Sequence, residues 1–311
     1  MGDRSAIEWT DATWSPVAGC SQVSPGCLNC YAIRETNRHR NLPKYAGLVK
    51  DGDWTGEVRC HPEALDQPLR WKKPRMIFVC SMSDLFHDKV PWEFIGKVFD
   101  VMIDCPQHTF QLLTKRPGRM AFWAEQMAPI CQKRRLPWRW PPNVWAGTSV
   151  ESQKYAPRLD CLLRVPAKVR FVSAEPLLSA LDLRPWLGCP HKSVEDGDII
   201  CPECGDAREK SRWIHQVIVG GESGPGARAM HPDWARSLRD QCQAAGVPYF
   251  FKQWGEWVSL NDAVRRNLPG VGITYQFDDM HLAMTRVGKK AAGAVLDGRE
   301  WREMPQAAGG S

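Results

Sequence analysis

The sequence contains no hydrophobic run long enough to cross a bilayer, so we expect no membrane partner. Its first residues, MGDRSAIEWTDATW, lack the basic start and the apolar stretch that mark a secretory signal peptide. Together these two absences predict a cytoplasmic chain. Because disulfides are rare in the reducing cytoplasm, the 12 cysteines are expected to be metal ligands or buried thiols.

The chain of 311 residues also lacks a large excess of charge of one sign, since it contains 41 Lys and Arg and 35 Asp and Glu. The resulting net charge of +6 permits a polyanionic partner without requiring one. The hydrophobic share of 43% and the charged share of 24% are typical of a globular protein with one large domain or two smaller ones. Trp, in contrast, is abundant with 15 residues, and Trp both fills cores and stacks on bases.

Three cysteines near the start form the most informative motif. Cys20, Cys27 and Cys30 stand in the segment GCSQVSPGCLNCY, where a Pro-Gly pair predicts a turn between the first two. Three thiolates can hold three irons of a four-iron cubane and leave the fourth iron open, as a radical enzyme needs. Zinc is the alternative, and because zinc takes four nitrogen or sulfur ligands, His39 or Cys60 would then have to join the site.

Six short apolar runs recur along the chain, with helical patterns between them. Their nearly regular spacing is typical of repeated βα units that build a parallel sheet. A further strand is expected in the region Thr13–Ala18, although Pro16 disfavours it. The six runs are Met76–Ser81, Thr109–Thr114, Asn143–Thr148, Val169–Ser173, Gln216–Gly220 and Val247–Lys252.

Polar residues follow each of these runs. In a βα barrel the active site lies at the carboxyl ends of the strands, so we expect these side chains to converge on one rim. They are Ser81, Ser83 and Asp84; Thr114, Lys115 and Arg116; Thr148, Ser149 and Glu151; Ser173 and Glu175; Glu222 and Ser223; and Lys252 and Gln253.

The segment Gly220–Gly226, GGESGPG, follows a predicted strand and has two interpretations. Flexible glycines allow backbone N–H groups to approach a ligand carboxylate or phosphate, and Glu222 could then bind an amine or ribose hydroxyls. The alternative is an ordinary turn between a strand and a helix.

The longest interval between predicted strands contains a polar insertion at residues 188–212. A short loop without a core of its own can be folded by a metal ion. The pattern predicts structural zinc, with an auxiliary iron-sulfur cluster as the alternative. Its four soft ligands are Cys189, His191, Cys201 and Cys204.

Apolar residues at helical spacing predict helices over residues 92–102 and 155–163. Pro232 is placed to begin another helix, which Gly246 would end. The expected division is a barrel over residues 1–187 and 213–260, the metal-binding insertion over 188–212, and a C-terminal extension over 261–311.

With these motifs in view, the chain resembles the radical S-adenosylmethionine (SAM) enzymes. More narrowly, it resembles the phage-associated "three-Cys-motif" proteins, a radical-SAM-like group of mostly unassigned function. The narrower resemblance extends over most of the chain. It rests on Ile7–Pro16, the block around the three cysteines, Ser83–Phe86, Leu113–Pro117, Ser173–Leu177, Gly220–Gly224 and Phe251–Gly255.

The resemblance implies an α/β fold, a partial (β/α)6-type barrel of mainly parallel strands. It implies that Cys20, Cys27 and Cys30 bind a 4Fe–4S cluster and that SAM chelates the open iron. Reduction by an electron donor such as flavodoxin or ferredoxin would cleave SAM to a 5′-deoxyadenosyl radical. The protein's own tasks would be to place the cofactor, exclude water and aim the substrate.

The sequence departs from the wider radical SAM pattern at two places. The first cysteine gap holds six residues instead of three, and Asn29 rather than an aromatic residue precedes Cys30. The Gly-Gly-Glu segment follows a late strand rather than the second. Candidates for SAM binding therefore come from strand-end position. They are Ser83, Asp84, Lys115, Ser149, Glu151, Glu175, Gly220, Gly221 and Glu222.

The substrate is indicated only by charge. The stretch Gln132–Pro142 interleaves basic residues with Trp, which suits a nucleic-acid surface or an ordinary solvated loop. Arg34, Arg38, His39 and Arg40 add positive charge just after the cysteines. Three hypotheses follow: a radical SAM enzyme for nucleotide or nucleic-acid modification or repair, a radical SAM enzyme acting on a small molecule or peptide, and a non-catalytic, zinc-stabilised nucleic-acid-binding protein.

Overall fold

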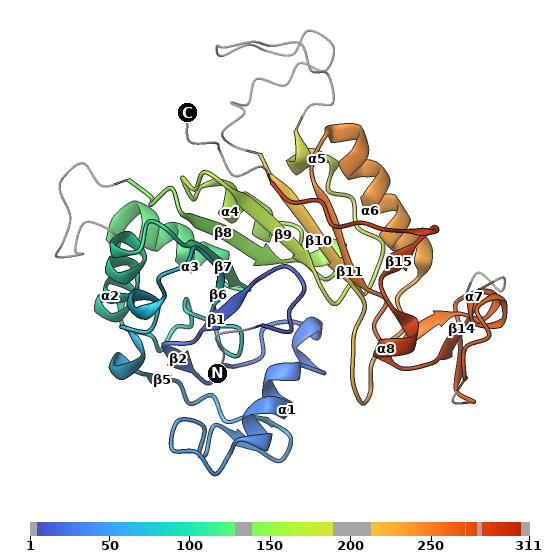
Figure 1. Cartoon of the computed structure of the whole chain (residues 1–311), viewed down its shortest axis with the longest axis horizontal. Helices are drawn as coiled ribbons and strands as arrows, with labels where there is room; N and C mark the ends of the chain where they lie inside the picture. Colours follow the sequence, from blue (N-terminus) through green and yellow to red (C-terminus); the bar gives the residue numbers. More distant parts are fainter. Residues whose placement is uncertain (1–4, 128–138, 189–212, 271, 279–281, 306–311) are drawn as a thin grey trace, which may run out of the picture. The chain divides into compact units, whose positions relative to one another are not determined.

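The computed structural model of the chain describes residues 5–127, 139–188, 213–270, 272–278 and 282–305. Its centre is a sheet of seven parallel strands that curls into a half-barrel (Figure 1). The predicted α/β fold with a partial barrel is therefore confirmed. In spatial order the strands are β1 (Ala12–Trp14), β6 (Met76–Val79), β7 (Thr109–Thr114), β8 (Val144–Ser149), β9 (Arg170–Ala174), β10 (Gln216–Gly220) and β11 (Tyr249–Gln253).

The central strands are buried along their whole length. Every residue of β8, β9 and β10 lies out of solvent, which explains why these strands read as continuous apolar runs instead of alternating ones. The strand expected around Pro16 is split in two. β1 ends at Trp14, and β2 (Val17–Ala18) pairs instead with the short strand β5 (Arg59–Cys60), because proline has no amide to donate to a ladder.

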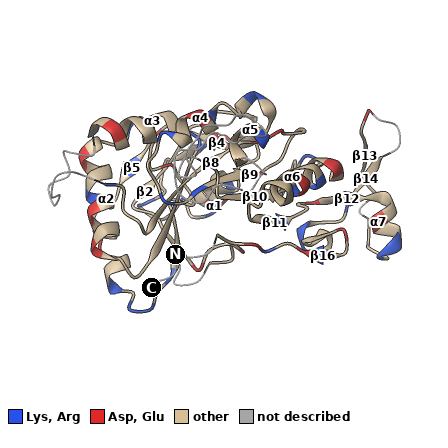
Figure 2. Cartoon of the chain, turned by 90° about the horizontal axis from the view of Figure 1, so that it is seen from above, with Lys and Arg blue, Asp and Glu red and all other residues tan. Residues whose placement is uncertain are grey.

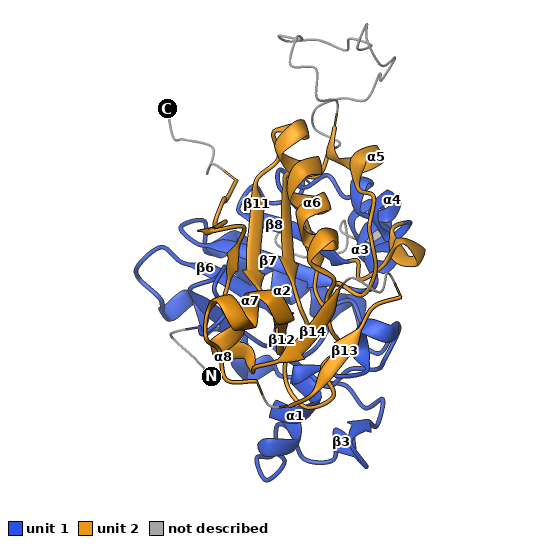
Figure 3. Cartoon of the chain, turned by 90° about the vertical axis from the view of Figure 1, so that its right-hand side faces the viewer, with its two compact units in different colours: residues 1–149, 157–171 blue, residues 150–156, 172–311 orange. Residues whose placement is uncertain are grey.

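The chain divides into two compact units, coloured separately in Figure 3. Unit 1 comprises residues 1–149 and 157–171. Helix α2 (Trp92–Asp104) packs the predicted apolar face, with Ile95, Phe99 and Met102 fully buried. The other helices and strands of unit 1 are η1 (Pro25–Cys27), α1 (Tyr31–Arg38), β3 (Val49–Lys50), β4 (Asp53–Trp54), η2 (Pro62–Ala64), η3 (Pro68–Arg70), α3 (Pro117–Phe122), η4 (Trp123–Met127) and α4 (Arg158–Leu163).

Unit 2 comprises residues 150–156 and 172–311. Helix α6 (Pro232–Ala245) begins at the predicted proline and ends at Gly246, whose φ of 65° is the left-handed conformation that glycine adopts most easily. The face of α6 that carries Leu238 and Cys242 is buried as expected. Unit 2 also contains η6 (Gln153–Tyr155) and α5 (Arg184–Leu187).

The chain after β11 forms a small antiparallel sheet in the order β12 (Trp257–Ser259), β14 (Ala283–Arg286) and β13 (Thr274–Gln276). Short helices and a hairpin accompany it: α7 (Leu260–Arg265), α8 (Lys289–Ala292), β15 (Val295–Leu296) and β16 (Arg299–Glu300). The proposed insertion at 188–212 lies almost wholly outside the described residues, so the expected domain division stays a prediction.

Two observations bear on the predicted partners of the protein. Within the described ranges, no helix is both long enough and apolar enough to cross a membrane. The positive charge is interleaved with negative charge on at least one helix, since α6 carries both basic and acidic residues (Figure 2).

Candidate functional site

The cysteine loop, residues 19–30 of unit 1, follows β2 and leads directly into α1. Gly19, just before Cys20, has a φ of 89°, and a Cβ there would lie 2.1 Å from the Glu57 carbonyl oxygen. Only glycine fits this position, because the backbone conformation and the close approach both exclude a side chain. The predicted Pro-Gly turn is formed by η1, which ends at Cys27, and Cys30 directly precedes α1.

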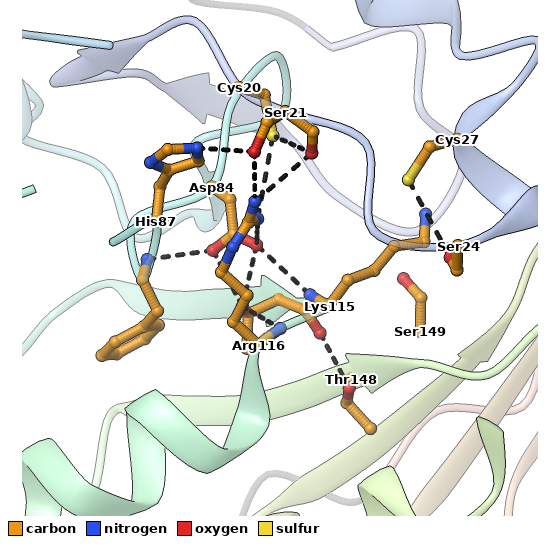
Figure 4. Close-up of polar contacts among 12 residues, drawn as sticks. Cys20, Ser21, Ser24, Cys27, Asp84, His87, Lys115, Arg116, Thr148 and Ser149 are labelled. Carbon is orange, nitrogen blue, oxygen red and sulfur yellow. Dashed lines mark hydrogen bonds and ion pairs between the residues drawn. The ribbon is translucent and has the colours of Figure 1, made fainter. Parts of the chain in front are cut away.

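Asp84 follows β6 and fixes Arg116, which follows β7 (Figure 4). Its carboxylate accepts hydrogen bonds from Arg116 Nη1 at 3.0 Å and from Thr114 Oγ1 at 2.8 and 2.9 Å. It also accepts from the backbone amides of Phe86 at 2.9 Å and Lys115 at 3.3 Å. The side chains of Arg116 and Asp84 are only 10% and 7% exposed. Both carboxylate oxygens are therefore satisfied, and the guanidinium is held in one orientation.

The other edge of the guanidinium faces the cysteine loop. Arg116 Nη1 lies 3.9 Å from Cys20 Sγ, and Nη2 donates to the Ser21 hydroxyl at 2.9 Å. His87 Nε2 lies 2.9 Å from the same hydroxyl. Since the Lys89 amide donates to His87 Nδ1 at 3.2 Å, the proton of neutral His87 is on Nε2 and is donated to Ser21. Ser21 thus accepts two hydrogen bonds, which fixes the loop beside Cys20.

Lys115 brings a second cation to the same loop. Its side chain reaches toward Ser24 and Cys27 (Figure 4), and Ser24 Oγ lies 3.9 Å from Cys27 Sγ. Its ammonium also acts on Cys30, where it opposes the rise in the pKa of the thiol. Two consecutive cations at the end of β7 therefore serve the three thiols, Arg116 at Cys20 and Lys115 near the other two.

Burial favours the neutral form of two of the thiols, Cys20 and Cys30. It raises the pKa of Cys20 to about 12, with Asp84 adding to the rise and Arg116 opposing it. Burial likewise raises the pKa of the Cys30 thiol. A bound metal needs thiolates, so loading this site must release protons.

The residues present fit an iron-sulfur cluster. Within the described part of the chain, no three His, Cys, Asp or Glu side chains gather closely enough to hold a single metal ion. A cubane places its three thiolates on three different irons, so they need not meet at one point. The donor set is three cysteines, which would bind a cluster as soft thiolates, and the cations Lys115 and Arg116 would offset the negative charge that such a cluster carries.

The other strand-end candidates of unit 1 have structural partners. Ser83 Oγ donates to the Val17 carbonyl at 2.8 Å, which ties the end of β6 to β2. Ser149 is buried, and its carbonyl accepts from Arg158 Nη1 at 2.9 Å. Thr148 Oγ1 donates to the carbonyl of Thr114 at 2.7 Å, and this bond links the ends of β8 and β7.

In unit 2, the glycine-rich segment is packed tightly against the chain. Glu222 is 6% exposed, and its carboxylate forms a two-point ion pair with Arg228, with contacts of 2.6 and 2.9 Å. A Cβ at Gly221 would lie 1.9 Å from the Trp254 carbonyl oxygen, and a Cβ at Gly255 would lie 2.1 Å from the Glu222 carbonyl oxygen. These glycines therefore allow two backbone segments to touch.

Glu175, which follows β9, is ion-paired with Lys252 of β11 at 2.6 Å between Oε1 and Nζ. A Cβ at Gly220 would lie 3.3 Å from the Glu175 carboxyl group, so this glycine leaves space for the pair. Glu151 is fully buried, and its carbonyl accepts from the Leu178 amide at 2.8 Å.

Sequence reasoning did not single out Ser21 and His87. A signal existed for both: Ser21 adjoins Cys20, and His87 lies three residues after Asp84 in the same strand-end segment. Two motifs that the sequence did single out, the basic Trp-containing stretch up to residue 138 and the zinc ligands Cys189, His191, Cys201 and Cys204, lie outside the described residues.

Comparison with known proteins gives a family. No curated protein matches the chain. Among solved structures, a variant of spore photoproduct lyase with a dinucleoside spore photoproduct is 12% identical with a TM-score of 0.29, over 51% of this chain and 44% of that one. Another spore photoproduct lyase variant is 8% identical with a TM-score of 0.32, over 88% of this chain and 67% of that one. The chain thus spans less than half the length of the first of these structures. The family described as "Protein of unknown function (DUF5131)" matches residues 4–305, and the chain therefore belongs to it.

Proposed function

We propose that this protein is an iron-sulfur enzyme that reductively cleaves SAM to a 5′-deoxyadenosyl radical, for modification or repair of a nucleotide or nucleic acid. The observation that carries the proposal is the loop of three cysteines that meets two consecutive cations, Lys115 and Arg116, at the strand ends of a parallel half-barrel. Membership of the phage-associated three-Cys-motif group is part of the same proposal.

In this proposal Cys20, Cys27 and Cys30 hold a 4Fe–4S cluster. When bound, such a cluster supplies the electron that cleaves SAM. Arg116 contributes a fixed positive charge and a hydrogen bond at Cys20, and Asp84 holds the guanidinium there. Hydrogen bonds to cluster sulfurs are one of the factors that set a cluster's reduction potential.

The SAM contacts are proposed from the same strand ends. Lys115 is the strongest candidate, because the described residues give its ammonium no ion-pair partner and it can bind a carboxylate. Asp84 and Ser83 act on the protein itself and would shape the site indirectly. Ser149, Glu151, Glu175, Gly220, Gly221 and Glu222 complete the proposed set.

A polyanionic substrate is supported by charge in unit 1. Arg34, Arg38 and Arg40 are exposed on or just after α1, the helix that begins directly after Cys30. Basic side chains at this place can neutralise phosphates and release counterions. The proposal also includes structural zinc at Cys189, His191, Cys201 and Cys204, and an electron donor such as flavodoxin or ferredoxin.

Anaerobic reconstitution with iron and sulfide tests the proposal. We expect a cubane electron paramagnetic resonance signal that shifts when SAM is added, and formation of 5′-deoxyadenosine under reduction. The triple variant Cys20→Ala, Cys27→Ala, Cys30→Ala should lose both. Cys161→Ser is the matched control, since Cys161 is a partly exposed thiol on α4, outside the cysteine loop, and this variant should keep the cluster.

Two results would redirect the proposal. A protein that binds two zinc ions and no cluster would be a metal-stabilised binding protein instead of a radical enzyme. A cluster-containing protein that binds neither nucleotides nor, in a salt-dependent way, DNA or RNA would act on another small molecule or a peptide.

A further inference from the structure

A local irregularity in the sheet of unit 2 changes which side chains face the end of β10. β10 and β11 pair in register from Val217 to Val219, but Gly220 then pairs with Gln253, so Lys252 is an extra residue on β11. This is a β-bulge, a feature that is common beside active sites because it redirects side chains. Residues that pair across a sheet share a face, so Gln253 lies on the face that Gly220 presents.

An ion pair occupies the same face. Gly220 has no side chain, and the Glu175 carboxyl group lies where a longer residue would crowd it, 3.3 Å from the position of a Cβ. Lys252 Nζ reaches Glu175 Oε1 at 2.6 Å, with side-chain exposures of 13% and 19%. The bulge and the glycine together therefore bring a donor and an acceptor of opposite charge to the ends of β9, β10 and β11.

In addition to the bulge and the ion pair, the side chain of Gln253 indicates a ligand. The residue is 3% exposed, and its buried Oε1 has no hydrogen-bond partner among the residues that the structure describes. A buried acceptor of this kind costs free energy unless a partner satisfies it. Its backbone is fixed, because its carbonyl accepts from the Gly221 amide at 2.9 Å, while the terminal amide torsion is soft and can turn toward a ligand.

We infer that these three side chains bind the hydrogen-bonding edge of a nucleobase. Gln253 offers an acceptor and a donor side by side, the arrangement with which Gln reads a base edge. Counting only the described residues, Lys252 retains donors beyond the one used on Glu175, and Glu175 retains an acceptor on its second oxygen. The ligand must present N–H donors next to acceptors on one planar edge, as nucleobases do.

This inference rests on the proposed function and specifies the chemistry of its substrate, but its test needs neither iron nor SAM. The full chain without reconstituted cluster is titrated calorimetrically with each of four nucleoside 5′-monophosphates and with short single-stranded oligonucleotides. Preference for monomers or for oligonucleotides distinguishes a free nucleotide from a nucleic acid as the source of the base. We expect at least one nucleotide to bind, and Gln253→Leu to weaken it at least tenfold.

Gln216→Leu is the matched control. Gln216 lies on the same face of β10 at the opposite end, and its buried Oε1 also lacks a partner within the described ranges. Gln253→Leu should raise the melting temperature, because it removes an unsatisfied buried oxygen, whereas Gln216→Leu also loses the bonds that Gln216 Nε2 donates to Glu303 and Met304 and should gain less. Only Gln253→Leu should weaken binding. Lys252→Met provides a second test at the same site and should weaken binding as well.

Three results would overturn the inference. The first is a wild-type protein that binds no nucleotide, or whose nucleotide binding is fully displaced by inorganic phosphate. The second is a Gln253→Leu protein that binds as tightly as the wild type. The third is binding of SAM, but of no nucleotide, that depends on Gln253. Loss of the cluster alone would leave the inference standing and would count only against the radical mechanism.

Discussion

Asp84–Arg116 in unit 1 and Glu175–Lys252 in unit 2 are both ion pairs at the carboxyl ends of sheet strands. In unit 1, the carboxylate accepts from a guanidinium, a hydroxyl and two backbone amides, so its lone pairs are used. In unit 2, the only hydrogen bond between described residues that uses the carboxylate comes from Lys252. On the adjacent residue, Gln253 Oε1 has no hydrogen-bond partner in the described part of the chain.

This difference separates positioning from binding. A fully satisfied buried network has no capacity left for a ligand, and its role is to hold a charge where the cysteine loop needs it. A network with an unpaired acceptor and a partly used carboxylate retains hydrogen-bonding capacity that a ligand can take up. Four substitutions or conditions test this division.

Asp84→Ala should cause the largest loss of unfolding free energy. It leaves the Arg116 charge buried without a partner, which typically costs about 3–5 kcal/mol of unfolding free energy. Urea unfolding measures this loss, and Asp84→Asn, which keeps one acceptor, should cost less. A loss similar to that of an exposed ion pair would show that the network is not structural.

Gly221→Ala should cause the next largest loss of unfolding free energy, about 1–3 kcal/mol. Its Cβ would overlap the Trp254 carbonyl oxygen and force the backbone to move. Gly220→Ala is the matched neighbour. Its Cβ would meet only the flexible Glu175 side chain at 3.3 Å, so the protein should remain folded while the ion pair shifts. Thermal melting of the two variants compares them, and equal losses would contradict the packing described for Gly221.

Glu175→Gln should lower the unfolding free energy by only about 1 kcal/mol. Lys252 keeps some solvent contact, and the new amide oxygen can still accept the hydrogen bond from Lys252. The same urea titration used for Asp84→Ala gives a direct comparison. If Glu175→Gln were the more damaging of the two, the roles assigned to the pairs would be reversed.

Lowering the pH should have the smallest effect on stability. Burial and Arg116 lower the pKa of His87 below its usual 6.5, so the unfolded chain binds this proton more readily than the folded one. The stability from neutral His87 is therefore present above pH 6.5 and is lost as pH falls through the window below it. His87→Gln should flatten the stability profile between pH 5 and 7 in part, because His108 is shifted in the same direction by burial. An unchanged profile would contradict the neutral His87 donor.

Several elements follow directly from the sequence. Helix α6 starts at a proline and ends at a glycine because these residues have strong local preferences, and both ends agree with the prediction. The six apolar runs become six parallel strands, because strands buried on both faces must be continuously apolar. At Pro16 the expected strand instead splits, since the amide that proline lacks matters only once the neighbouring strand is known.

Local patterns in the sequence were enough to predict the half-barrel elements and the loop of Cys20, Cys27 and Cys30, because periodicity, turns and caps act between near neighbours in the chain. Which charges pair could be learned from the folded structure alone. Asp84 meets Arg116 across two strands, and Glu222 is bound by Arg228 although its position suited a ligand. The bulge at Lys252 likewise depends on the register with β10. Hydrogen bonds and ion pairs act over a few ångströms of space, and separation along the chain does not fix that distance.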